Sequence, residues 1–333
     1  MSTPIDVLGI GNAIVDTLAR AEDDALVALG LHKGGMQLVD EARAAQLYGA
    51  MGPTTVMSGG SAANTLVGVA GFGCSSAFIG KVKDDAAGRE FAHDIRSAGV
   101  GFDTPFAADG AATARCLVLV TPDGQRTMST FLGACQALGP ADVDEELVRS
   151  AGILYLEGYL WDPPAAKEAF LKAARASKAA GKRVALSLSD AFCVDRYRDE
   201  FLGLVRDGLV DILFANESEL HSLYQTADFE TAVKALSAEN NLLGVVTRSE
   251  KGVVVIEGAR RVAVPAYPVK EVVDTTGAGD LFAAGFLAGL ARGLPHEGGA
   301  SLGALAAAEV ISHVGARPQK DLRQLARDHG LLA

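Results

Sequence analysis

Short apolar segments alternate with segments of helical spacing along most of the chain, and this alternation restricts the possible fold more than any other feature. Apolar segments without polar alternation are typical of strands in a parallel sheet that is buried on both faces. Repeated strand–helix units therefore predict an α/β fold with a doubly wound, mostly parallel central sheet and helices on both faces. The predicted strands are residues 6–11, 75–80, 184–188, 212–214, 243–247 and 252–256, and the predicted helices are residues 61–70, 163–182 (ending near Gly181), 201–207, 280–292 and 298–313.

Two stretches interrupt this alternation. Residues 33–40 carry a short strand-like segment, and residues 113–120 and 126–130 flank the hairpin turn Thr121-Pro-Asp-Gly124. They predict a small second sheet that leans over the main sheet like a lid. We expect one domain over residues 1–333, with the lid formed by insertions at about 13–48 and 111–131.

Composition disfavours several classes of protein. The chain has 30 Lys and Arg against 41 Asp and Glu, and its net charge of −11 disfavours a nucleic-acid partner, because phosphate backbones need basic surfaces. The 4 cysteines show no zinc-ligand spacing, so we expect them to pack as small apolar residues in a reducing compartment. No apolar run has the length of a membrane span, and the N-terminus does not resemble a secretory signal. We therefore expect a cytoplasmic protein without a membrane partner.

The segment 271–290 carries the strongest chemical signal. An apolar run stops, Thr-Thr-Gly-Ala-Gly turns the chain, and Asp280 opens a helical pattern rich in Ala, Leu and Phe. Gly277, Ala278 and Gly279 are too small to shield the backbone, so their N–H groups can converge on an anion at the positive end of the helix dipole. Phosphoryl transfer to a hydroxyl requires exposed backbone amides that stabilise the charge of the phosphate and one carboxylate that takes the proton of the hydroxyl. The alternative is a plain strand-to-helix turn with Asp280 as an ordinary helix-start residue.

Two further motifs suit a sugar. Gly59 and Gly60 precede a helix and let the backbone approach a ligand closely, and Asn64 can donate to and accept from a hydroxyl. The alternative is a plain loop with a helix cap. Asn12 and Asp16 follow the first strand, and ligands of such sheets bind outside the carboxyl ends of the strands. A carboxylate there can accept hydrogen bonds from two adjacent sugar hydroxyls, although Asp16 could equally be a solvated loop charge.

Oxygen ligands also follow the predicted strand 212–214. Asn216 and Glu219 could hold a hydrated Mg²⁺, which keeps several waters and touches few protein groups. The alternative is a helix start with Asn216 as the cap and Glu219 as its capping-box partner, and both interpretations can hold at once. His313 is a candidate for the lining of a nucleotide pocket, with a plain surface position as the alternative.

Two familiar phosphate motifs do not match. Six residues separate Gly73 from Gly80-Lys81 instead of four, and Val82 stands in place of the Ser or Thr of a P-loop. A dinucleotide-like pattern begins at Gly9 but has Ile14 where its third glycine belongs. An NAD-linked dehydrogenase is therefore a weak alternative.

Taken together, the motifs resemble the ribokinase-like (PfkB-type) carbohydrate kinase family from Gly9 to about Gly315. The segment 274–280 matches its C-terminal signature, and Gly59-Gly60 with Asn64 and residues 80–88 match its N-terminal signature, apart from Lys83 in place of a frequent glycine. The resemblance implies ATP as the phosphate donor and Asp280 as the base, with the amides from Gly277 to Asp280 stabilising the transferring phosphoryl group. It also implies these further roles: Asn216 and Glu219 organise Mg²⁺ and phosphate through water, Thr247 and Gly252 form a loop under the nucleotide, and Asp274 and Thr276 lie where relatives bind a monovalent cation, usually K⁺.

Within that family, the segment from Gly9 to Asp16 looks like the adenosine kinase branch. Arg126 matches an arginine that this branch has near the phosphates, and Gln136 stands where it tends to have Asn. Leu160 stands near the position of an aromatic that stacks on the purine. Tyr159 and Trp161 are the possible substitutes.

The sequence thus predicts an ATP-dependent phosphotransferase acting on a primary alcohol of a nucleoside or sugar, with adenosine as the first acceptor to test. The same chemistry on ribose, fructose, a keto-deoxy sugar acid or inosine is the nearest alternative. A non-catalytic sensor that binds nucleosides or sugars is the alternative from another class. The open strand edges of a lid also suggest a homodimer through the lid strands.

Overall fold

A nine-stranded sheet forms the centre of the larger part of the molecule. In the computed structural model, which describes residues 4–333, the strand order is β14-β13-β12-β11-β10-β9-β1-β5-β6. Neighbouring strands are parallel from β6 to β12, and only β12–β13 and β13–β14 are antiparallel. The strands are β1 (Ile5–Ile10), β5 (Ser76–Ile79), β6 (Val100–Gly101), β9 (Ala151–Glu157), β10 (Arg183–Ser187), β11 (Ile212–Asn216), β12 (Leu243–Thr247), β13 (Val253–Glu257) and β14 (Arg260–Val264). The predicted doubly wound, mostly parallel sheet is confirmed.

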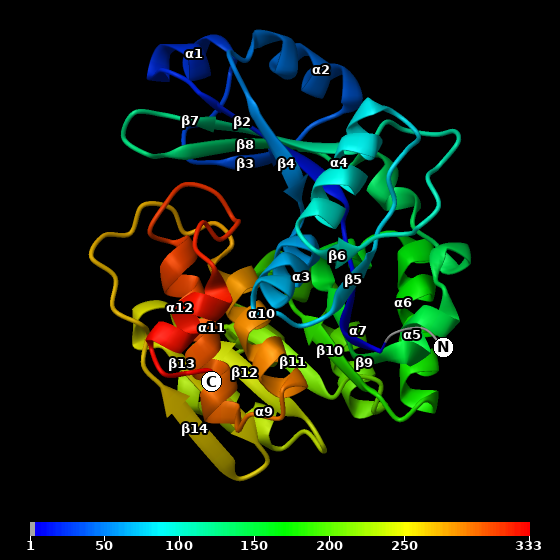
Figure 1. The fold of residues 1–333 in the computed structure, drawn as a ribbon, viewed down its shortest axis with the longest axis vertical. Helices are drawn as coiled ribbons and strands as arrows, with labels where there is room; N and C mark the ends of the chain where they lie inside the picture. Colours follow the sequence, from blue (N-terminus) through cyan, green and yellow to red (C-terminus); the bar gives the residue numbers. More distant parts are fainter. Residues whose placement is uncertain (1–3) are drawn as a thin grey trace.

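Helices cover both faces of this sheet (Figure 1). Successive side chains of one strand enter opposite cores: Val7 packs with one set of helices, and Leu8 packs with the other. This is why the central strands are apolar without alternation. One face carries α3 (Ser61–Gly71), α4 (Ala86–Ser97), α10 (Ala278–Ala291), α11 (His296–Val310) and α12 (Leu322–Asp328), and the other carries α5 (Glu145–Ser150), α6 (Pro164–Ala179), α7 (Ala191–Arg206), α8 (Glu217–Tyr224) and α9 (Phe229–Ser237).

Helix α10 is apolar on all sides because it is buried between its neighbours. Every residue from Leu281 to Leu290 is buried. A Cβ atom added at Gly285 would lie 2.5 Å from the Gly303 nitrogen, so the backbones of α10 and α11 approach closely. This tight packing fixes the N-terminus of α10, which carries Asp280, relative to the central sheet.

A five-stranded small sheet lies beyond the carboxyl ends of the central strands (Figure 1). Its order is β3-β8-β7-β2-β4, and helices α1 (Asp23–Ala28) and α2 (Glu41–Ala50) cover its outer face, where Leu26 and Leu47 pack with Leu117 and Leu119. Its strands are β2 (Ile14–Arg20), β3 (Met36–Leu38), β4 (Thr55–Gly59), β7 (Ala114–Val120) and β8 (Arg126–Phe131). The predicted insertions supply β2, β3, β7 and β8, whereas β4 comes from outside them and leads directly into α3.

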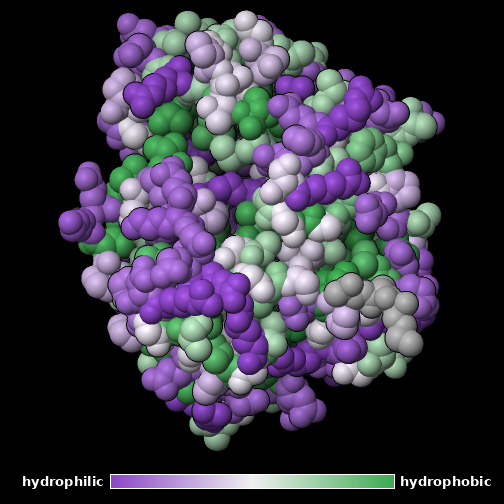
Figure 2. All heavy atoms as spheres, viewed as in Figure 1, coloured by the Kyte–Doolittle hydropathy of each residue, from purple (hydrophilic) through white to green (hydrophobic). Residues whose placement is uncertain are grey.

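Several elements differ from those expected. The predicted helix 201–207 is the second half of α7, which has non-helical backbone angles at Tyr197. Strand β9 was missing from the prediction, because α5 ends at Ser150 and β9 begins at the next residue without a turn signal. Within residues 4–333, no helix is long and apolar enough to cross a membrane. The face seen in Figure 2 carries hydrophilic and apolar side chains side by side.

Candidate active site

A cleft of about 830 Å³ lies between the small sheet and the carboxyl ends of the central strands. Alternate residues of the small-sheet strands face it, such as Ile14 and Asp16 on β2 and Met128 and Thr130 on β8. The ends of β9 to β12 form its opposite wall. Most of the predicted site residues line it: Asn12, Asp16, Gly60, Asn64, Asn216, Glu219, Thr247, Thr276, Gly277, Gly279 and Asp280.

The N-terminus of α10 opens into this cleft. Gly277 is the N-cap residue and has left-handed backbone angles, with φ of 77°. A Cβ atom there would lie 2.8 Å from Ala316, so both the conformation and the packing require glycine. A Cβ atom at Gly279 would meet nothing within 4 Å, and this residue is exposed and lines the cleft. The turn is therefore accessible to an anion at the positive end of the helix dipole.

Asp280 lies in the first turn of α10, partly buried in the cleft wall. Ser61 Oγ donates to its Oδ1 at 2.6 Å, and Asn64 Nδ2 donates to its Oδ2 at 3.1 Å. Burial raises the pKa of Asp280 to about 6, while these two hydrogen bonds and the charge of Arg317 oppose the rise. The carboxylate is thus oriented by α3, and it can be ionised at neutral pH while still accepting a proton. Ser61 was missing from the sequence prediction.

Unpaired hydrogen-bond acceptors gather at the small-sheet end of the cleft. The side-chain oxygens of Asn12 and Asn64 are buried and have no donor among residues 4–333. Asp16 lies beside them, with its carboxylate packed so closely on Gly59 that a Cβ atom there would lie 2.3 Å away. Burial raises the pKa of Asp16 to about 6, while the charges of Arg317 and Arg126 oppose the rise. A buried acceptor without a donor costs about 1–3 kcal/mol, so this end of the cleft favours a ligand rich in hydroxyl groups.

Glu157 is a buried carboxylate that the sequence prediction did not include. Its Oε1 accepts from Asn12 Nδ2 at 2.7 Å and its Oε2 accepts from the Ala62 N–H at 2.8 Å. Burial raises the pKa of Glu157 to about 7, against the effect of these donors. The residue joins the end of β1 to the start of α3. Because Glu157 ends the missing strand β9, no sequence signal placed it at the site.

Asn216 and Glu219 form the capping box that was the alternative interpretation. Asn216 Oδ1 accepts from the Glu219 N–H at 2.8 Å, and Glu219 Oε2 accepts from the Asn216 N–H at 2.9 Å. Both residues also line the cleft, so the capping role does not remove them from the site. Burial raises the pKa of Glu219 to about 7.

Other predicted residues lie outside the cleft lining. Arg126 Nη1 forms a buried ion pair with Asp274 Oδ2 at 2.6 Å. The same carboxylate also accepts from the N–H groups of Thr276 and Gly315, at 3.0 and 2.8 Å. Asp274 therefore already has a positive partner and two further donors, an arrangement that does not fit a K⁺ ion bound to this carboxylate.

The remaining predicted residues are placed as follows. His313 Nε2 lies 3.3 Å from Glu309 Oε1, at the end of α11. Gln136 is exposed. Gly252 has φ of 84°, and a Cβ atom there would lie 2.2 Å from the Val264 carbonyl oxygen. The turn between β12 and β13 therefore requires glycine at this position. Gly59 and Ala278 are the direct neighbours of cleft residues.

Aromatic side chains stand at the mouth of the cleft. Leu160 and Trp161 are buried in the core, whereas Tyr159 and Phe192 line the cleft and are 43% and 76% exposed. The Tyr159 N–H donates to Ser189 Oγ at 3.1 Å, which joins the turn that carries Tyr159 to the segment just before α7, the helix that carries Phe192. Of the two predicted substitutes for an aromatic at position 160, the structure thus brings Tyr159 to the cleft.

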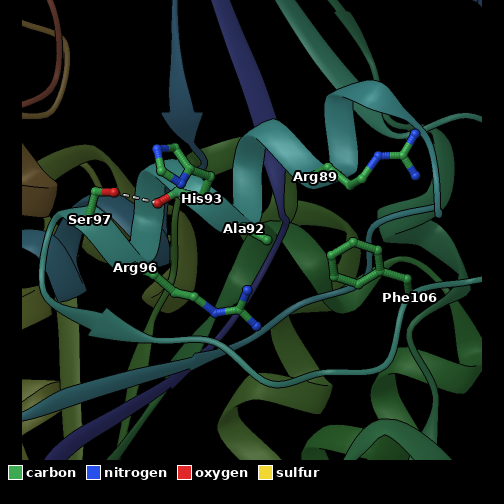
Figure 3. A pocket seen from close by; sticks show the side chains of 6 residues that line it. All are labelled: Arg89, Ala92, His93, Arg96, Ser97 and Phe106. Atoms are coloured by element: carbon green, nitrogen blue, oxygen red, sulfur yellow. Dashed lines mark hydrogen bonds between the residues drawn. The ribbon is translucent and has the colours of Figure 1, made fainter.

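A second hollow lies on the outer face of α4. Arg89, His93, Arg96 and Phe106 line its volume of about 390 Å³. Figure 3 shows that the His93 ring points away from the side chains of Arg89 and Arg96. Arg89 and Arg96 are also paired with Asp84 and Asp103. Because the charges do not converge, this hollow does not form an anion site.

The cleft geometry agrees with comparisons to known proteins. Residues 36–322 match the model of the pfkB family carbohydrate kinases. The chain belongs to this family. It is therefore an ATP-dependent kinase of a nucleoside or sugar, and the resemblance noted in the sequence is confirmed.

Two solved structures are similar over nearly the whole chain. An adenosine kinase from Sinorhizobium meliloti is 50% identical with a TM-score of 0.90, over 98% of this chain and 100% of that one. A probable sugar kinase from Rhizobium etli CFN 42 is 49% identical with a TM-score of 0.92, over 99% of this chain and 100% of that one. An ATP-dependent ribose-1-phosphate kinase from Halopiger xanaduensis is 32% identical over 69% of this chain and 72% of its own length. These kinases differ in acceptor, so the acceptor has to be argued from the cleft.

Proposed function

We propose that this kinase transfers the γ-phosphoryl group of ATP to the primary alcohol of a nucleoside, with adenosine as the leading acceptor. The observation that carries the proposal is the two-part character of the acceptor end of the cleft. The unpaired oxygens of Asn12 and Asn64, together with the Asp16 carboxylate in the same cleft lining, suit the hydroxyl groups of a ribose. An apolar mouth stands beside them.

The apolar mouth suits a flat base. Met36 and Leu38 of β3 enter it from the small sheet, 58% and 63% exposed, and Tyr159 and Phe192 enter it from the opposite wall. Exposed apolar groups that gather around a cleft are typical of a binding surface. Aromatic rings stack on bases, and such stacking is worth about 1–3 kcal/mol per base. Free ribose or fructose would leave these side chains in water.

The charge of the cleft favours a neutral acceptor. Its acidic lining residues include Asp16, Glu157, Asp162 and Asp190, whereas Arg196 is the one Lys or Arg among the described residues that line it. A sugar acid or a sugar phosphate would add a further negative charge to this surface. Nucleosides such as adenosine and inosine carry none. The similarity to the Sinorhizobium meliloti adenosine kinase favours adenosine between these two.

The reaction needs one proton acceptor and one site for the phosphates. The alcohol oxygen attacks the γ-phosphorus, its proton passes to the Asp280 carboxylate, and ADP leaves with the electrons of the broken P–O bond. The amides of Gly277 to Asp280 would stabilise the charge on the transferring group, because the cleft lining offers little cationic charge. The small sheet, acting as the predicted lid, would close over the acceptor and exclude water.

The residues at α8 fit Mg²⁺ only through water. Asn216 and Glu219 already bond to each other, but each Glu219 oxygen accepts one hydrogen bond and keeps a further lone pair, and the residue lines the cleft. Among residues 4–333 no three His, Cys, Asp or Glu side chains gather as a metal site, so the nucleotide phosphates would supply the direct ligands. When bound, the metal ion would neutralise charge on the phosphates. Thr247 at the end of β12 and the Gly252 turn would lie under the nucleotide.

A panel of acceptors tests the proposed function directly. Purified protein with ATP and Mg²⁺ is assayed for ADP formation with adenosine, inosine, cytidine, ribose, fructose and a keto-deoxy sugar acid. Adenosine should give the highest kcat/KM, and the product should be the 5′-monophosphate. A higher kcat/KM with a free sugar or a sugar acid would contradict the nucleoside assignment.

The predicted homodimer would use the edge strands β3 and β4 of the small sheet. Light scattering of the purified protein tests this oligomeric state.

A further inference from the structure

Arg317 lies in the loop between α11 and α12 and contacts the end of β4. Its Nη2 donates to the Ser58 carbonyl oxygen and, at 2.8 Å, to the Ser58 hydroxyl. The Ser58 hydroxyl and N–H in turn donate to Asp94 Oδ2 on α4, at 2.5 and 2.7 Å. Ser58 directly precedes Gly59 and Gly60. The network therefore fixes the strand end from which the backbone of the sugar site emerges.

The two residues before Arg317 contact the segment 274–279 at the start of α10, which is called the phosphate loop below because the proposed function places the phosphates there. The Gly315 N–H donates to Asp274 Oδ2 at 2.8 Å, just before the turn into α10. Ala316 packs directly against Gly277, where a Cβ atom would lie 2.8 Å from the Ala316 Cα. Three consecutive residues thus connect the loop that begins α10 to the end of β4. A shift of one of these parts would be transmitted to the other through a short, well-packed segment.

Arg317 also brings a positive charge among acidic groups. The guanidinium faces Asp16, Asp94 and Asp280 within Coulombic range, without a direct ion pair to any of them. Its Nε is buried and has no hydrogen-bond partner among the described residues. Arg317 as a whole is half-buried, but a charged side chain with a buried, unpaired Nε is costly to hold unless its charge is used.

We propose that Arg317 is a positioning residue for phosphoryl transfer, which holds the sugar-binding end of β4 against the phosphate loop and sets a positive charge opposite Asp16 and Asp280. The inference rests on the proposed function, because those two carboxylates must be ionised to bind a hydroxyl and to take its proton. Burial works against their ionisation, and the charge of Arg317 works for it.

The other groups around the two carboxylates do not replace this charge. Besides Arg317, the titratable groups near Asp16 are Arg126 on β8, Cys116 on β7 and Asp280. Those near Asp280 are Asp16, Tyr155 and Glu157 on β9, and Tyr159 after β9. Arg126 is the one further cation in this set, and it is paired with Asp274. If Arg317 were removed, the one cation left in this set would be Arg126, and the charge of Arg126 is already balanced by Asp274.

The experiment compares Arg317→Gln and Arg317→Lys with a matched control. Arg261→Gln removes one arginine from the surface of β14, where Arg261 pairs with Glu230 far from the cleft lining. Each protein is measured for kcat, KM and the pH profile of kcat/KM, with the acceptor that the wild type uses best, and for its Tm. Ser58→Ala is added because it removes the bridging hydroxyl but keeps the charge of Arg317.

Arg317→Gln should lower kcat/KM at pH 7 by about 10–10²-fold, and its acidic limb should move up by about one pH unit. Arg317→Lys should restore most of the pH profile, because it keeps the charge, while its KM stays raised. Ser58→Ala should raise KM without moving the pH profile, and Arg261→Gln should behave as wild type. If Arg317→Gln fails to fold, the Lys and Ser58 variants still decide.

Two results would overturn the proposal. One is a pH profile of Arg317→Gln that superimposes on wild type with kcat/KM within about twofold. The other is an equal loss at every pH in both Arg317 variants together with a large fall in Tm, which would show a role in stability alone. Near-normal turnover by an Asp280→Asn variant is a different failure, because it contradicts the proposed base and not the effect of Arg317.

Discussion

Arg126 of β8 and Asp274 of the loop before α10 form an ion pair of 2.6 Å in which both side chains are almost completely buried. The pair joins the small sheet to the segment that leads into the turn of residues 277–279 at the start of α10. Asp274 lies three residues before Gly277, so the seating of the small sheet and the geometry of that turn share one contact. The Thr276 N–H completes the link by donating to the same carboxylate.

Replacing one member of this ion pair should lower the free energy of unfolding more than replacing both members. Asp274→Asn should lower the free energy of unfolding by about 3 kcal/mol, because Arg126 would remain buried without a counter-charge. The double variant Arg126→Met with Asp274→Asn should recover part of that loss. Urea denaturation of the two single variants and the double variant measures the coupling. Strictly additive losses would mean that the two side chains do not interact as the geometry indicates.

Asp280→Asn should lower kcat by about 10²–10⁴-fold, because an amide cannot take the proton of the acceptor alcohol. The affinity for the acceptor, measured by calorimetry, should change little, since Asn12, Asn64 and Asp16 still hold its hydroxyl groups. Asp84→Asn, a surface carboxylate paired with Arg89, is the matched control and should keep normal turnover. A kcat within tenfold of wild type would remove Asp280 from the role of base.

The pH profile should report the raised pKa values of two carboxylates. Asp280 must be deprotonated to act as a base, and Asp16 must be ionised to accept from the sugar. Burial raises the pKa of each to about 6, so kcat/KM should be full above that value and should fall as the pH drops through it. Because the two groups interact, the observed values belong to the pair, and the acidic limb should approach a slope of two. An activity that stays constant from pH 8 to 5 would contradict this prediction.

The aromatic rings at the cleft mouth should matter for nucleosides and not for free sugars. Phe192→Ala and Tyr159→Ala should each raise the KM for adenosine by about 10-fold, because each removes a surface for stacking on the base. Any residual turnover of ribose should be unchanged, which makes ribose the internal control. Equal losses for both acceptors would show that the rings support the fold of the loops instead.

Glu157→Gln should change how stability depends on pH. The folded protein binds the Glu157 proton more tightly than the unfolded chain does, because burial raises its pKa from 4.5 to about 7. Its contribution to stability is therefore complete below about pH 4.5 and is lost as the pH rises through 7. Relative to the variant, wild type should lose on the order of 2 kcal/mol between pH 5 and 7.5. Urea denaturation at the two pH values measures the difference, and parallel behaviour of the two proteins would contradict the prediction.

The sequence by itself determined the fold class and the chemistry of the central loop. Apolar strands without alternation require a sheet covered on both faces, and small residues before Asp280 leave backbone amides open, because both effects depend on neighbours in the chain. The capping box of Asn216 and Glu219 follows from the same local logic. Strand β9, which no turn signal precedes, is one of the elements that local patterns missed.

Only the tertiary structure decided which distant residues meet. The contacts of Ser61 with Asp280, Glu157 with Asn12, and Arg317 with Ser58 join residues that lie 145 or more positions apart, and no local pattern encodes them. The structure also decided between Tyr159 and Trp161, because a two-residue step along a short helical turn sends one ring to the cleft and the other into the core. Burial, charge balance and the pairing of polar atoms are properties of three-dimensional neighbours, so the pKa values and the acceptor end of the site emerge only from the fold.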